Sequence, residues 1–332
     1  MLAPATDRPP RLFVVCPVYR DAPAFTELRG RVRQVLSGRN APGELRFVVT
    51  DDTAGEDAEL AAMRDGQTAV LVPPYNLGHQ GAIVYALREL APTLRPDDVV
   101  VTMDSDGEDR PEDLPALLAP LLERREDLLL VSVARRTSRQ ESFAFRVSYL
   151  AFKAVFRLLT GVVIRSGNFA AMRGALVVAA IGHPCFDQCY SSSLISLPFR
   201  RRDVPLARGA RYSGRSRMGF IRLVTHGMHM LMPFLDRIAV RCLLASAVVG
   251  AAAAASLVTI LTAADVAPLW SPGVAVTLLV SAGFGVFAAL TLFATASRSR
   301  AQSVRVLHSE QFLGRRMPTT ASRDPGDVPV AD

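Results

Sequence analysis

The chain has 332 residues, half of them hydrophobic, with a mean hydropathy of +0.23 and a formal net charge of +7. A basic balance is compatible with binding nucleic acid, anionic lipid or a phosphorylated substrate. Because the sequence has no zinc-finger spacing and no basic-aromatic surface motif, we expect no nucleic acid partner. The apolar residues concentrate after about residue 238, which predicts a globular part followed by a membrane part.

The N-terminal residues and the cysteines indicate a reducing compartment. Residues 1–10 are polar and rich in proline; we expect them to be flexible, and they lack the apolar stretch of a signal peptide. Four cysteines are too few for a disulfide framework in a chain of this length. Cys185 and Cys189, with His183 nearby, leave a metal site open, although a single pair favours reduced structural thiols. The globular part is therefore expected in the cytoplasm.

Short apolar runs alternate with amphipathic stretches along the first half of the chain. The runs predict strands at Arg11–Pro17, Leu45–Thr50, Ala69–Val72, Val99–Met103 and Leu128–Ala134. The stretches between them predict helices at Phe25–Leu36, Gln80–Leu90 and Leu114–Arg124. This alternation is typical of an α/β domain with a mostly parallel sheet, in which ligands bind at the carboxyl ends of the strands.

The stretch from Phe143 to Ile164 combines basic and aromatic residues at helical spacing. Arg146, Lys153 and Arg157 share one side of the predicted helix, and the aromatic side chains lie on the others. Such a helix can lie in the membrane interface. The alternative is an ordinary helix docked on the sheet, since aromatic stripes usually belong to a core.

Two long uncharged stretches follow, Cys242–Ala264 and Val266–Ser297. Each exceeds the roughly 20 residues that cross a bilayer. We therefore expect transmembrane helices over about residues 242–264 and 273–296, joined by a short link that contains Trp270. Arginines flank the outer ends of both stretches and are absent from the link, which places both ends of the chain in the cytoplasm.

These boundaries predict four regions. A flexible N-terminus, residues 1–10, precedes a globular domain over residues 11–237. The membrane part spans residues 238–297, and the polar residues 298–332 are expected to form a disordered tail.

Carboxylates follow the fourth predicted strand, in the sequence VVVTMDSDGEDRPEDLP. Asp104 and Asp106 lie at the carboxyl end of this strand and converge if a turn begins there. Paired carboxylates suit a hard divalent cation, which takes oxygen ligands and can neutralise a diphosphate leaving group. Aspartates are also common in ordinary turns, so the pair gains its meaning from the neighbouring motifs.

Three further polar motifs follow the other predicted strands. Residues 11–21, RLFVVCPVYRD, are a strand followed by a Pro-Tyr-Arg turn and an aspartate. Asp51 and Asp52 end the second strand. Asn76, Gly78 and Gly81 open a helix, where backbone amides can hold a phosphate and glycines allow its close approach.

In this order, the motifs resemble the family 2 glycosyltransferases of the GT-A fold, specifically the dolichol-phosphate-mannose-synthase-like branch that glycosylates polyprenyl phosphates. The resemblance covers about Arg11 to Arg241, and the paired C-terminal helices also match that branch. It implies a Rossmann-like nucleotide-sugar-binding domain. It also implies that the nucleotide is held by Pro17, Tyr19, Asp21, Asp51 and Asp52.

The metal motif of that family is approximately D-A-D-L-Q-D-P-P-E, and here it is D-S-D-G-E-D-R-P-E. By resemblance, Asp104 and Asp106 bind Mg²⁺ or Mn²⁺ and with it the donor. Glu108 replaces a glutamine that can also reach the metal, so it keeps an oxygen ligand and adds a negative charge. Gly107 and Arg110 depart from the motif and leave the shape of the loop open.

The later G-D-F-R element of the family appears here as Gly167-Asn168-Phe169-Ala170, so that Asn168 stands where the family has an aspartate. An acceptor phosphate is largely dianionic at pH 7 and attacks without a general base, whereas a hydroxyl acceptor needs one. The substitution therefore favours a phosphate acceptor. For a hydroxyl acceptor, the next available carboxylate is Asp187.

Residues 208–220, RGARYSGRSRMGF, resemble the family's R-x-x-G-x-S-K-M loop, with Arg217 at the lysine position. Arg211, Arg215 and Arg217 alternate at a spacing that can surround a pyrophosphate and stabilise its developing charge. The alternative is a solvated basic loop near lipid headgroups. The Q-x-x-R-W motif of processive synthases is absent, which favours the transfer of a single sugar.

The sequence thus predicts an inverting transfer of one hexose from a UDP- or GDP-hexose to a polyprenyl phosphate such as undecaprenyl phosphate. We expect the reaction at the cytoplasmic face of the inner membrane, in the synthesis of cell-envelope glycans. The alternatives are a hydroxyl acceptor with Asp187 as base, and a membrane scaffold that has lost catalysis. Whether identical chains associate stays open.

Overall fold

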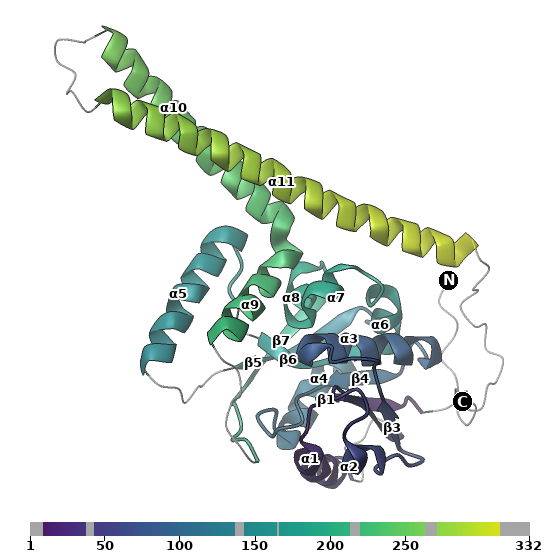
Figure 1. Cartoon of the computed structure of the whole chain (residues 1–332). Helices are drawn as coiled ribbons and strands as arrows, with labels where there is room; N and C mark the ends of the chain where they lie inside the picture. Colours follow the sequence, from purple (N-terminus) through teal and green to yellow (C-terminus); the bar gives the residue numbers. More distant parts are fainter. Residues whose placement is uncertain are drawn as a thin grey trace.

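The computed structural model describes residues 9–37, 43–136, 143–164, 166–212, 220–262 and 271–312. An α/β domain carries a pair of long helices that project from it (Figure 1). The strands are β1 Leu12–Val18, β2 Leu45–Asp51, β3 Thr68–Leu71, β4 Val99–Thr102, β5 Leu130–Arg136, β6 Ser166–Arg173 and β7 Arg200–Leu206.

The helices follow the strands in α/β alternation before the chain turns fully helical. Those of the first half are α1 Ala22–Val35, α2 Ala58–Ala61, α3 Gly78–Leu90 and α4 Leu114–Glu123. Those of the second half are α5 Phe143–Thr160, α6 Gly174–Ala180, α7 Cys185–Gln188, α8 Tyr190–Ser196, α9 Phe220–Leu231, α10 Leu235–Thr262 and α11 Ser271–Phe312. The short 3₁₀ helices are η2 Ala91–Thr93, η3 Pro111–Asp113 and η4 Met232–Phe234.

The seven strands form one sheet in the order β3-β2-β1-β4-β6-β5-β7. The pairs β1–β2, β1–β4, β2–β3 and β5–β7 are parallel, and β6 runs antiparallel to both β4 and β5. The prediction of a mostly parallel α/β sheet is confirmed, with the five predicted strands in place. β6 and β7 were not predicted; the run Ser166–Arg173 has little of the apolar pattern of a buried strand, and pairing with β4 and β5 makes it one.

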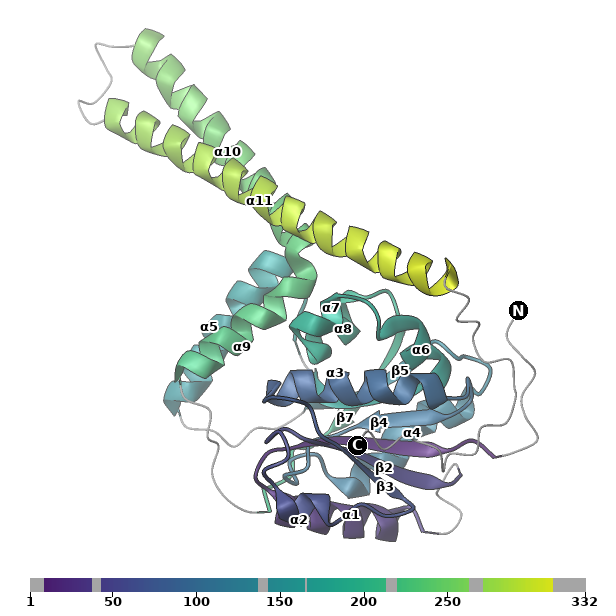
Figure 2. The same cartoon turned by 45° about the vertical axis from the view of Figure 1, so that its right-hand side comes forward.

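Helices cover both faces of the sheet (Figure 2). Side chains alternate between the faces of a strand, so Leu12 and Val14 of β1 join the core under α1 and α4, while Phe13 and Val15 join the core under α3, α6 and α8. Because both faces are buried, β1 is apolar along its whole length. The polar residues are left to the ends of the strands, where the chain turns.

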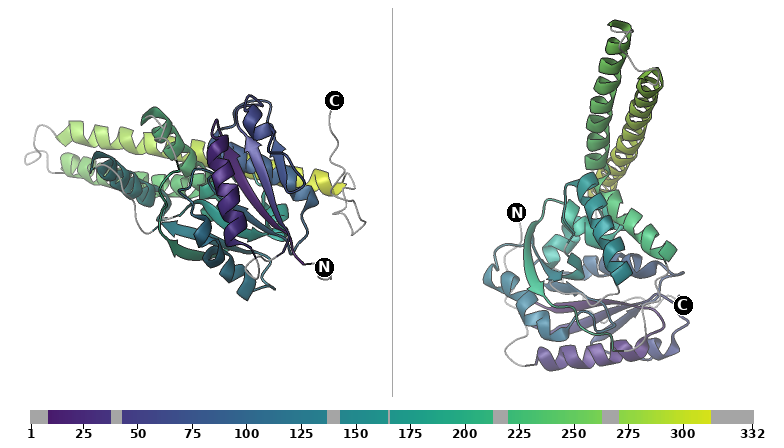
Figure 3. Two further views of the ribbon diagram at one scale, coloured as in Figure 1. Left: turned by 90° about the horizontal axis from the view of Figure 1, so that it is seen from below. Right: turned by 90° about the vertical axis from the view of Figure 1, so that its left-hand side faces the viewer.

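The helices α10 and α11 lie side by side and project from the domain (Figure 3). Each contains a span apolar enough to cross a membrane, with a mean hydropathy of 2.1 and only 11% of the span buried within the molecule. Large apolar side chains point outward, and small ones repeat every seven residues between the helices. The buried small residues are Ala239, Ser246 and Ala253 on α10 and Ala275, Ala282 and Ala289 on α11.

The ends of these helices differ from the predicted boundaries. α10 begins at Leu235 instead of residue 242, and α11 continues to Phe312, through the first part of the predicted disordered tail. Extending an existing helix avoids the cost of nucleation, and residues 298–312 contain alanine, leucine, glutamine and arginine, which favour helix. The predicted link with Trp270, the tail beyond residue 312 and residues 1–8 lie outside the described residues.

The close approach of the two helices gives a stability prediction at Gly285. A Cβ atom on Gly285 would collide with Ser246 of α10, whereas one on Gly283 would meet nothing within 4 Å. We expect Gly285→Leu to lower the stability of the hairpin by about 1–3 kcal/mol, the usual cost of overpacking. Thermal unfolding in detergent should show a lower midpoint for Gly285→Leu and no such fall for Gly283→Leu. Equal midpoints for the two variants would contradict this packing.

At the base of the hairpin, α5 packs on α9, η4 and α10 (Figure 2). Phe156 is 1% exposed, and its ring meets that of Phe234 edge-on at 5.4 Å between centroids. Leu150 and Leu158 of α5 and Ile221 of α9 are instead more than half exposed. These two helices therefore bury one face against each other and η4, and leave an apolar face uncovered beside the membrane-length helices.

Candidate active site

An acidic loop follows β4 at the carboxyl edge of the sheet. Asp104, Asp106 and Glu108 each offer a carboxylate oxygen, and these oxygens lie within 4.8 Å of one another. Among the described residues, this is the one group of histidine, cysteine and acidic side chains that converges in this way. Cys185 and Cys189 do not form such a group; Cys189 is fully buried and its thiol donates to Gln80.

The shape of the acidic loop is set by Gly107 and Asp109. Gly107 has φ +92°, a left-handed conformation that glycine adopts freely, so this departure from the family motif has a conformational reason. Asp109 is buried; its Oδ2 accepts from the backbone N–H of Asp104 at 2.8 Å, and its other oxygen pairs with Arg136. The sequence reasoning missed Asp109 and Arg136, because their pairing depends on the approach of β5.

A side chain at Gly107 should distort the acidic loop. A Cβ atom there would lie 2.8 Å from the ring of Tyr212, and the positive φ adds about 1–2 kcal/mol for a residue with a side chain. We expect Gly107→Ala to weaken Mn²⁺ binding at least about threefold, because the loop must shift to relieve both strains. Electron paramagnetic resonance of free Mn²⁺ measures this, with Gly66→Ala, where a Cβ meets nothing within 4 Å, as the control. Unchanged affinity would show that the loop tolerates the side chain.

A basic segment, residues 207–212, lies against the acidic loop. The backbone N–H of Gly209 donates to the carbonyl oxygen of Glu108 at 2.9 Å, and that of Tyr212 donates to the carbonyl oxygen of Asp106 at 2.8 Å. The guanidinium of Arg211 contacts Glu108 at 2.9 Å and Asp106 at 3.1 Å. The structure thus brings Arg211 to the acidic loop, whereas Arg215 and Arg217 lie outside the described residues.

Arg208 also pairs with Glu108, and no site role had been predicted for it. The guanidinium groups of Arg208 and Arg211 both pair with the carboxylate of Glu108 and partly offset the negative charge of the acidic loop. Burial raises the pKa of Asp106, and the neighbouring charge of Asp104 raises it further. The acidic loop is therefore a place where negative charge is concentrated and an added cation is stabilised.

Asn168 and His79 lie on the other side of Asp104. The Nε2 atom of His79 is 2.9 Å from Oδ1 of Asp104 and 2.6 Å from Nδ2 of Asn168. Asn168 Nδ2 also donates to Asp104 Oδ1 at 3.4 Å. Burial alone would raise the pKa of Asp104, but the charge and hydrogen bond of His79 and the amide of Asn168 outweigh it and lower the pKa to about 2. Asp104 is thus ionised at neutral pH.

The residues predicted to hold the nucleotide gather at the ends of β1 and β2. Ser105 Oγ donates to the carbonyl oxygen of Pro17 at 3.1 Å, which joins the end of β1 to the acidic loop. Tyr19 is 48% exposed beyond β1, and Asp21 precedes the first turn of α1. Asp51 is fully buried; its Oδ1 accepts from Thr53, and its Oδ2 has no partner among the described residues.

Asp52 and Asn76 hold each other. Asn76 Nδ2 donates to Asp52 Oδ2 at 3.0 Å, and the backbone N–H of Leu77 donates to Asp52 Oδ1 at 2.6 Å. Burial raises the pKa of Asp52 in spite of these bonds. The pair ties the end of β2 to the start of α3, where Gly78 has φ +71° and Gly81 lies against Leu77. The predicted phosphate-binding turn is therefore placed beside the predicted nucleotide site.

Residues 13–177 match the model of glycosyl transferase family 2. The chain carries a family 2 glycosyltransferase domain. It is 25% identical over 226 residues to undecaprenyl-phosphate 4-deoxy-4-formamido-L-arabinose transferase of Proteus mirabilis (strain HI4320). It is 26% identical over 225 residues to the protein of the same name from Edwardsiella ictaluri (strain 93-146). Each alignment covers 64% of this chain and 64% of the relative, slightly less than two thirds of either protein.

Solved structures with similar folds share little sequence with the glycosyltransferase domain. Mannosyl-3-phosphoglycerate synthase from Rubrobacter xylanophilus is 14% identical with a TM-score of 0.42, covering 69% of this chain and 74% of that one. S. aureus TarS 1-349 is 15% identical with a TM-score of 0.38, covering 70% of this chain and 65% of that one. Because both TM-scores are below 0.5, the fold is described from the strand order and strand pairing of the sheet alone.

The acidic loop of the glycosyltransferase domain fits a hard divalent cation. All three converging ligand atoms are carboxylate oxygens, the donors that Mg²⁺ and Mn²⁺ prefer over softer nitrogen or sulfur ligands. The oxygens of Asp104, Asp106 and Glu108 lie close enough to share one ion. The guanidinium of Arg211 lies beside them, 3.1 Å from Asp106.

Asp187 is not brought to the acidic loop. Its Oδ1 pairs with Arg88 Nη1 at 2.6 Å, and its side chain is 48% exposed. Arg88 follows His79 by nine residues on α3, which corresponds to about 14 Å along the helix at 1.5 Å per residue. The geometry of the glycosyltransferase domain therefore gives no support to Asp187 as the base for a hydroxyl acceptor.

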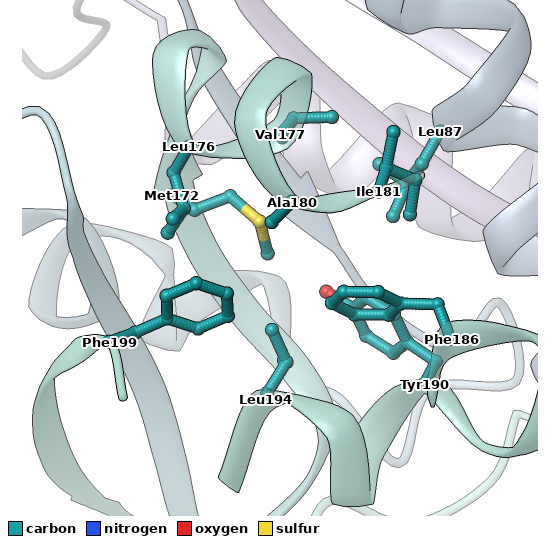
Figure 4. Close-up of a pocket in the computed structure, with 10 residues that line it drawn as sticks. All are labelled: Leu87, Met172, Leu176, Val177, Ala180, Ile181, Phe186, Tyr190, Leu194 and Phe199. Atoms are coloured by element: carbon teal, nitrogen blue, oxygen red, sulfur yellow. The ribbon is translucent and has the colours of Figure 1, made fainter. Parts of the chain in front are cut away.

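A small apolar pocket lies between α3, α6, α7 and α8 (Figure 4). The hydroxyl of Tyr190 is its single polar side-chain group, and it shares a hydrogen bond of 2.9 Å with Thr102. With no charged side chain in its lining, this pocket offers nothing to hold a diphosphate. The three carboxylates of the acidic loop, with Arg211 beside them, are the polar groups that this pocket lacks. The pocket is lined by Leu87, Met172, Leu176, Val177, Ala180, Ile181, Phe186, Tyr190, Leu194 and Phe199.

Proposed function

We propose that this protein transfers a single hexose from a nucleotide-sugar to a polyprenyl phosphate, with undecaprenyl phosphate as the expected acceptor. The names of the two relatives support this acceptor, since both are undecaprenyl-phosphate transferases. The donor is a UDP- or GDP-hexose, and the reaction inverts the configuration of the anomeric carbon. It takes place at the cytoplasmic face of the inner membrane.

The observation that carries the proposal is the uncharged Asn168 beside Asp104. Its amide nitrogen lies 3.4 Å from the carboxylate, and an amide cannot take the proton that a hydroxyl acceptor would have to lose. The ionised Asp104, with a pKa of about 2, is held by His79 and is a poor proton acceptor. An acceptor that brings its own negative oxygen fits this site, and a phosphate monoester is such an acceptor.

In this mechanism, the chain's residues bind the donor and stabilise the departing diphosphate. Asp104, Asp106 and Glu108 would hold Mg²⁺ or Mn²⁺, which would neutralise charge on the leaving group. Arg211 moves from the carboxylates to the diphosphate as charge develops there. A phosphate oxygen of the acceptor attacks the anomeric carbon from the opposite side, and the bond from that carbon to the diphosphate oxygen breaks. No proton needs to be removed from the acceptor.

Two apolar helices of membrane length support a site held at the depth of the acceptor phosphate. We propose that α10 and α11 cross the bilayer, with both chain ends in the cytoplasm and the domain over residues 11–237 beside the membrane. The uncovered apolar faces of α5 and α9 then lie in the interface. Exposed Arg157 of α5 and Arg237 and Arg241 of α10 suit the anionic headgroups there.

Membranes that contain the protein should transfer label from one donor to a lipid. Radiolabelled nucleotide-sugars are incubated one at a time with these membranes and undecaprenyl phosphate, and the label that enters the organic phase is counted. Membranes without the protein are the control. No lipid label with any donor would refute the proposed acceptor, and label in a neutral glycolipid would favour a hydroxyl acceptor instead. A scaffold without catalysis would give neither product.

A further inference from the structure

The side-chain amide of Gln80, in the first turn of α3, lies between Asn168 and the start of α8. Its Oε1 accepts from the backbone N–H of Ser191 at 3.0 Å and from the thiol of Cys189 at 3.5 Å. Its Nε2 donates to Asn168 Oδ1 at 2.6 Å. Because a backbone N–H can only donate, Ser191 fixes which end of the Gln80 amide faces α8. The NH₂ end must then face Asn168.

The same reasoning passes from Gln80 to Asn168. The NH₂ group of Gln80 can only donate, so the oxygen of the Asn168 amide faces Gln80 and its NH₂ group faces Asp104. The backbone of Asn168 is also held, since its carbonyl oxygen accepts from Thr102 Oγ at 2.6 Å. Both the position and the orientation of this amide are therefore determined by neighbours outside the acidic loop.

We propose that Gln80 is a positioning residue, which acts through Asn168 to present a fixed N–H donor to the metal ligand Asp104. The proposal rests on the proposed function in taking Asp104 as a metal ligand. It gives Asn168 a reason to replace an aspartate. A carboxylate at this position would instead face Asp104 with a second negative charge. The oriented amide supports Asp104 without that repulsion.

Substitutions of Gln80 test this relay, meaning the hydrogen bonds that run from Ser191 through Gln80 and Asn168 to Asp104. In Gln80→Glu, the new carboxylate still accepts from Ser191 but has no NH₂ group, so one of its oxygens meets the oxygen of Asn168. The Asn168 amide is then expected to turn and to present its oxygen to Asp104, which displaces the carboxylate. Loss of a hydrogen bond to a charged group corresponds to about a tenfold weaker Mn²⁺ binding. Gln80→Leu removes the hydrogen bond that orients the Asn168 amide and adds no charge. It should weaken Mn²⁺ binding about threefold.

A double-mutant cycle separates positioning from a direct effect. If Gln80 acts through Asn168, then Gln80→Glu in an Asn168→Ala background should change Mn²⁺ affinity less than twofold. The measurement uses electron paramagnetic resonance of free Mn²⁺ with the full chain in detergent. Gln34→Glu, the same chemical change on the exposed face of α1, controls for the added negative charge and should leave the affinity unchanged.

An equal effect of Gln80→Glu in both backgrounds would overturn the proposal, and so would unchanged affinity in both Gln80→Glu and Gln80→Leu. Tighter binding in Gln80→Glu would also overturn it, because the turned Asn168 oxygen would then be serving as an additional ligand. The cycle contains no donor or acceptor, so its result does not depend on finding the substrates. Conversely, failure to label any lipid would refute the proposed function and leave this relay intact.

Discussion

Replacing Asp106 with asparagine should lower the rate of sugar transfer by about a thousandfold. Asparagine keeps the size of the side chain and removes the charge that Arg211 contacts and that the proposed metal ion would need. A thousandfold loss corresponds to about 4 kcal/mol of transition-state stabilisation, at 1.36 kcal/mol for each factor of ten. This is within the several kcal/mol that a bound metal ion supplies to a developing negative charge. The measurement is kcat/KM for transfer from the active donor.

Asp187→Asn is the matched control for this variant. It makes the same chemical change at an aspartate that pairs with Arg88, about 14 Å along α3 from His79. We expect Asp187→Asn to retain activity within about twofold of the unchanged protein. Loss of activity in Asp187→Asn with retention in Asp106→Asn would reverse the assignment and favour a hydroxyl acceptor with Asp187 as its base.

Asp98→Asn should cause a large loss of stability in the domain. Asp98 is fully buried at the start of β4, where its carboxylate accepts from the side chains and backbone N–H groups of Arg11 and Arg95. Removing its charge leaves two guanidinium groups beside a neutral amide. Breaking a buried ion pair in this way typically costs about 3–5 kcal/mol. Chemical denaturation in detergent measures the change in the free energy of unfolding.

The exposed pair of Arg20 and Glu56 provides the comparison. Their side chains are 59% and 67% exposed, and solvent screens such a pair. Glu56→Gln should therefore change the free energy of unfolding much less than Asp98→Asn does. Similar losses of stability in Asp98→Asn and Glu56→Gln would contradict this prediction. They would mean that the buried ion pairs of Asp98 with Arg11 and Arg95 stabilise the fold no more than an exposed pair does.

Comparing the unchanged protein with Asp98→Asn also gives a pH test. Burial tends to raise the pKa of Asp98, but the hydrogen bonds from Arg11 and Arg95 outweigh it, so the folded-state pKa lies below the ordinary value. A depressed pKa stabilises the fold above the unfolded-state pKa of about 4 and loses this contribution as the pH falls toward the folded-state pKa. The stability of the unchanged protein should therefore fall below about pH 4 more steeply than that of Asp98→Asn.

The local pattern of the sequence was enough to predict much of the fold. Strands β1 to β5 are apolar runs that end in polar turns, and each lies within about two residues of its predicted bounds. β6 was missed, because a segment that contains Gly167 and Asn168 becomes a strand only through its antiparallel pairing with β4 and β5. The tertiary neighbours outweighed a weak local preference.

In the candidate site, too, some residues could be identified from the local sequence and others only from tertiary contacts. Asp104 and Asp106 could be named from their position after a strand, and Arg211 from its loop motif. His79, Gln80 and Arg136 could not, because their partners are distant in sequence: Gln80 meets Asn168 88 residues away and Ser191 111 residues away. No local spacing records such contacts.

The acidic loop and the membrane-length helices were thus determined by the sequence alone, since composition and short-range pattern decide which segments turn, which are buried and which are apolar enough for lipid. The tertiary structure decided how the site is held. It placed Asn168 as an oriented amide beside Asp104, separated Asp187 from the acidic loop, and explained Gly107 by its positive φ. The physical reason is that hydrogen-bond orientation and backbone conformation depend on which segments of the chain the fold brings together.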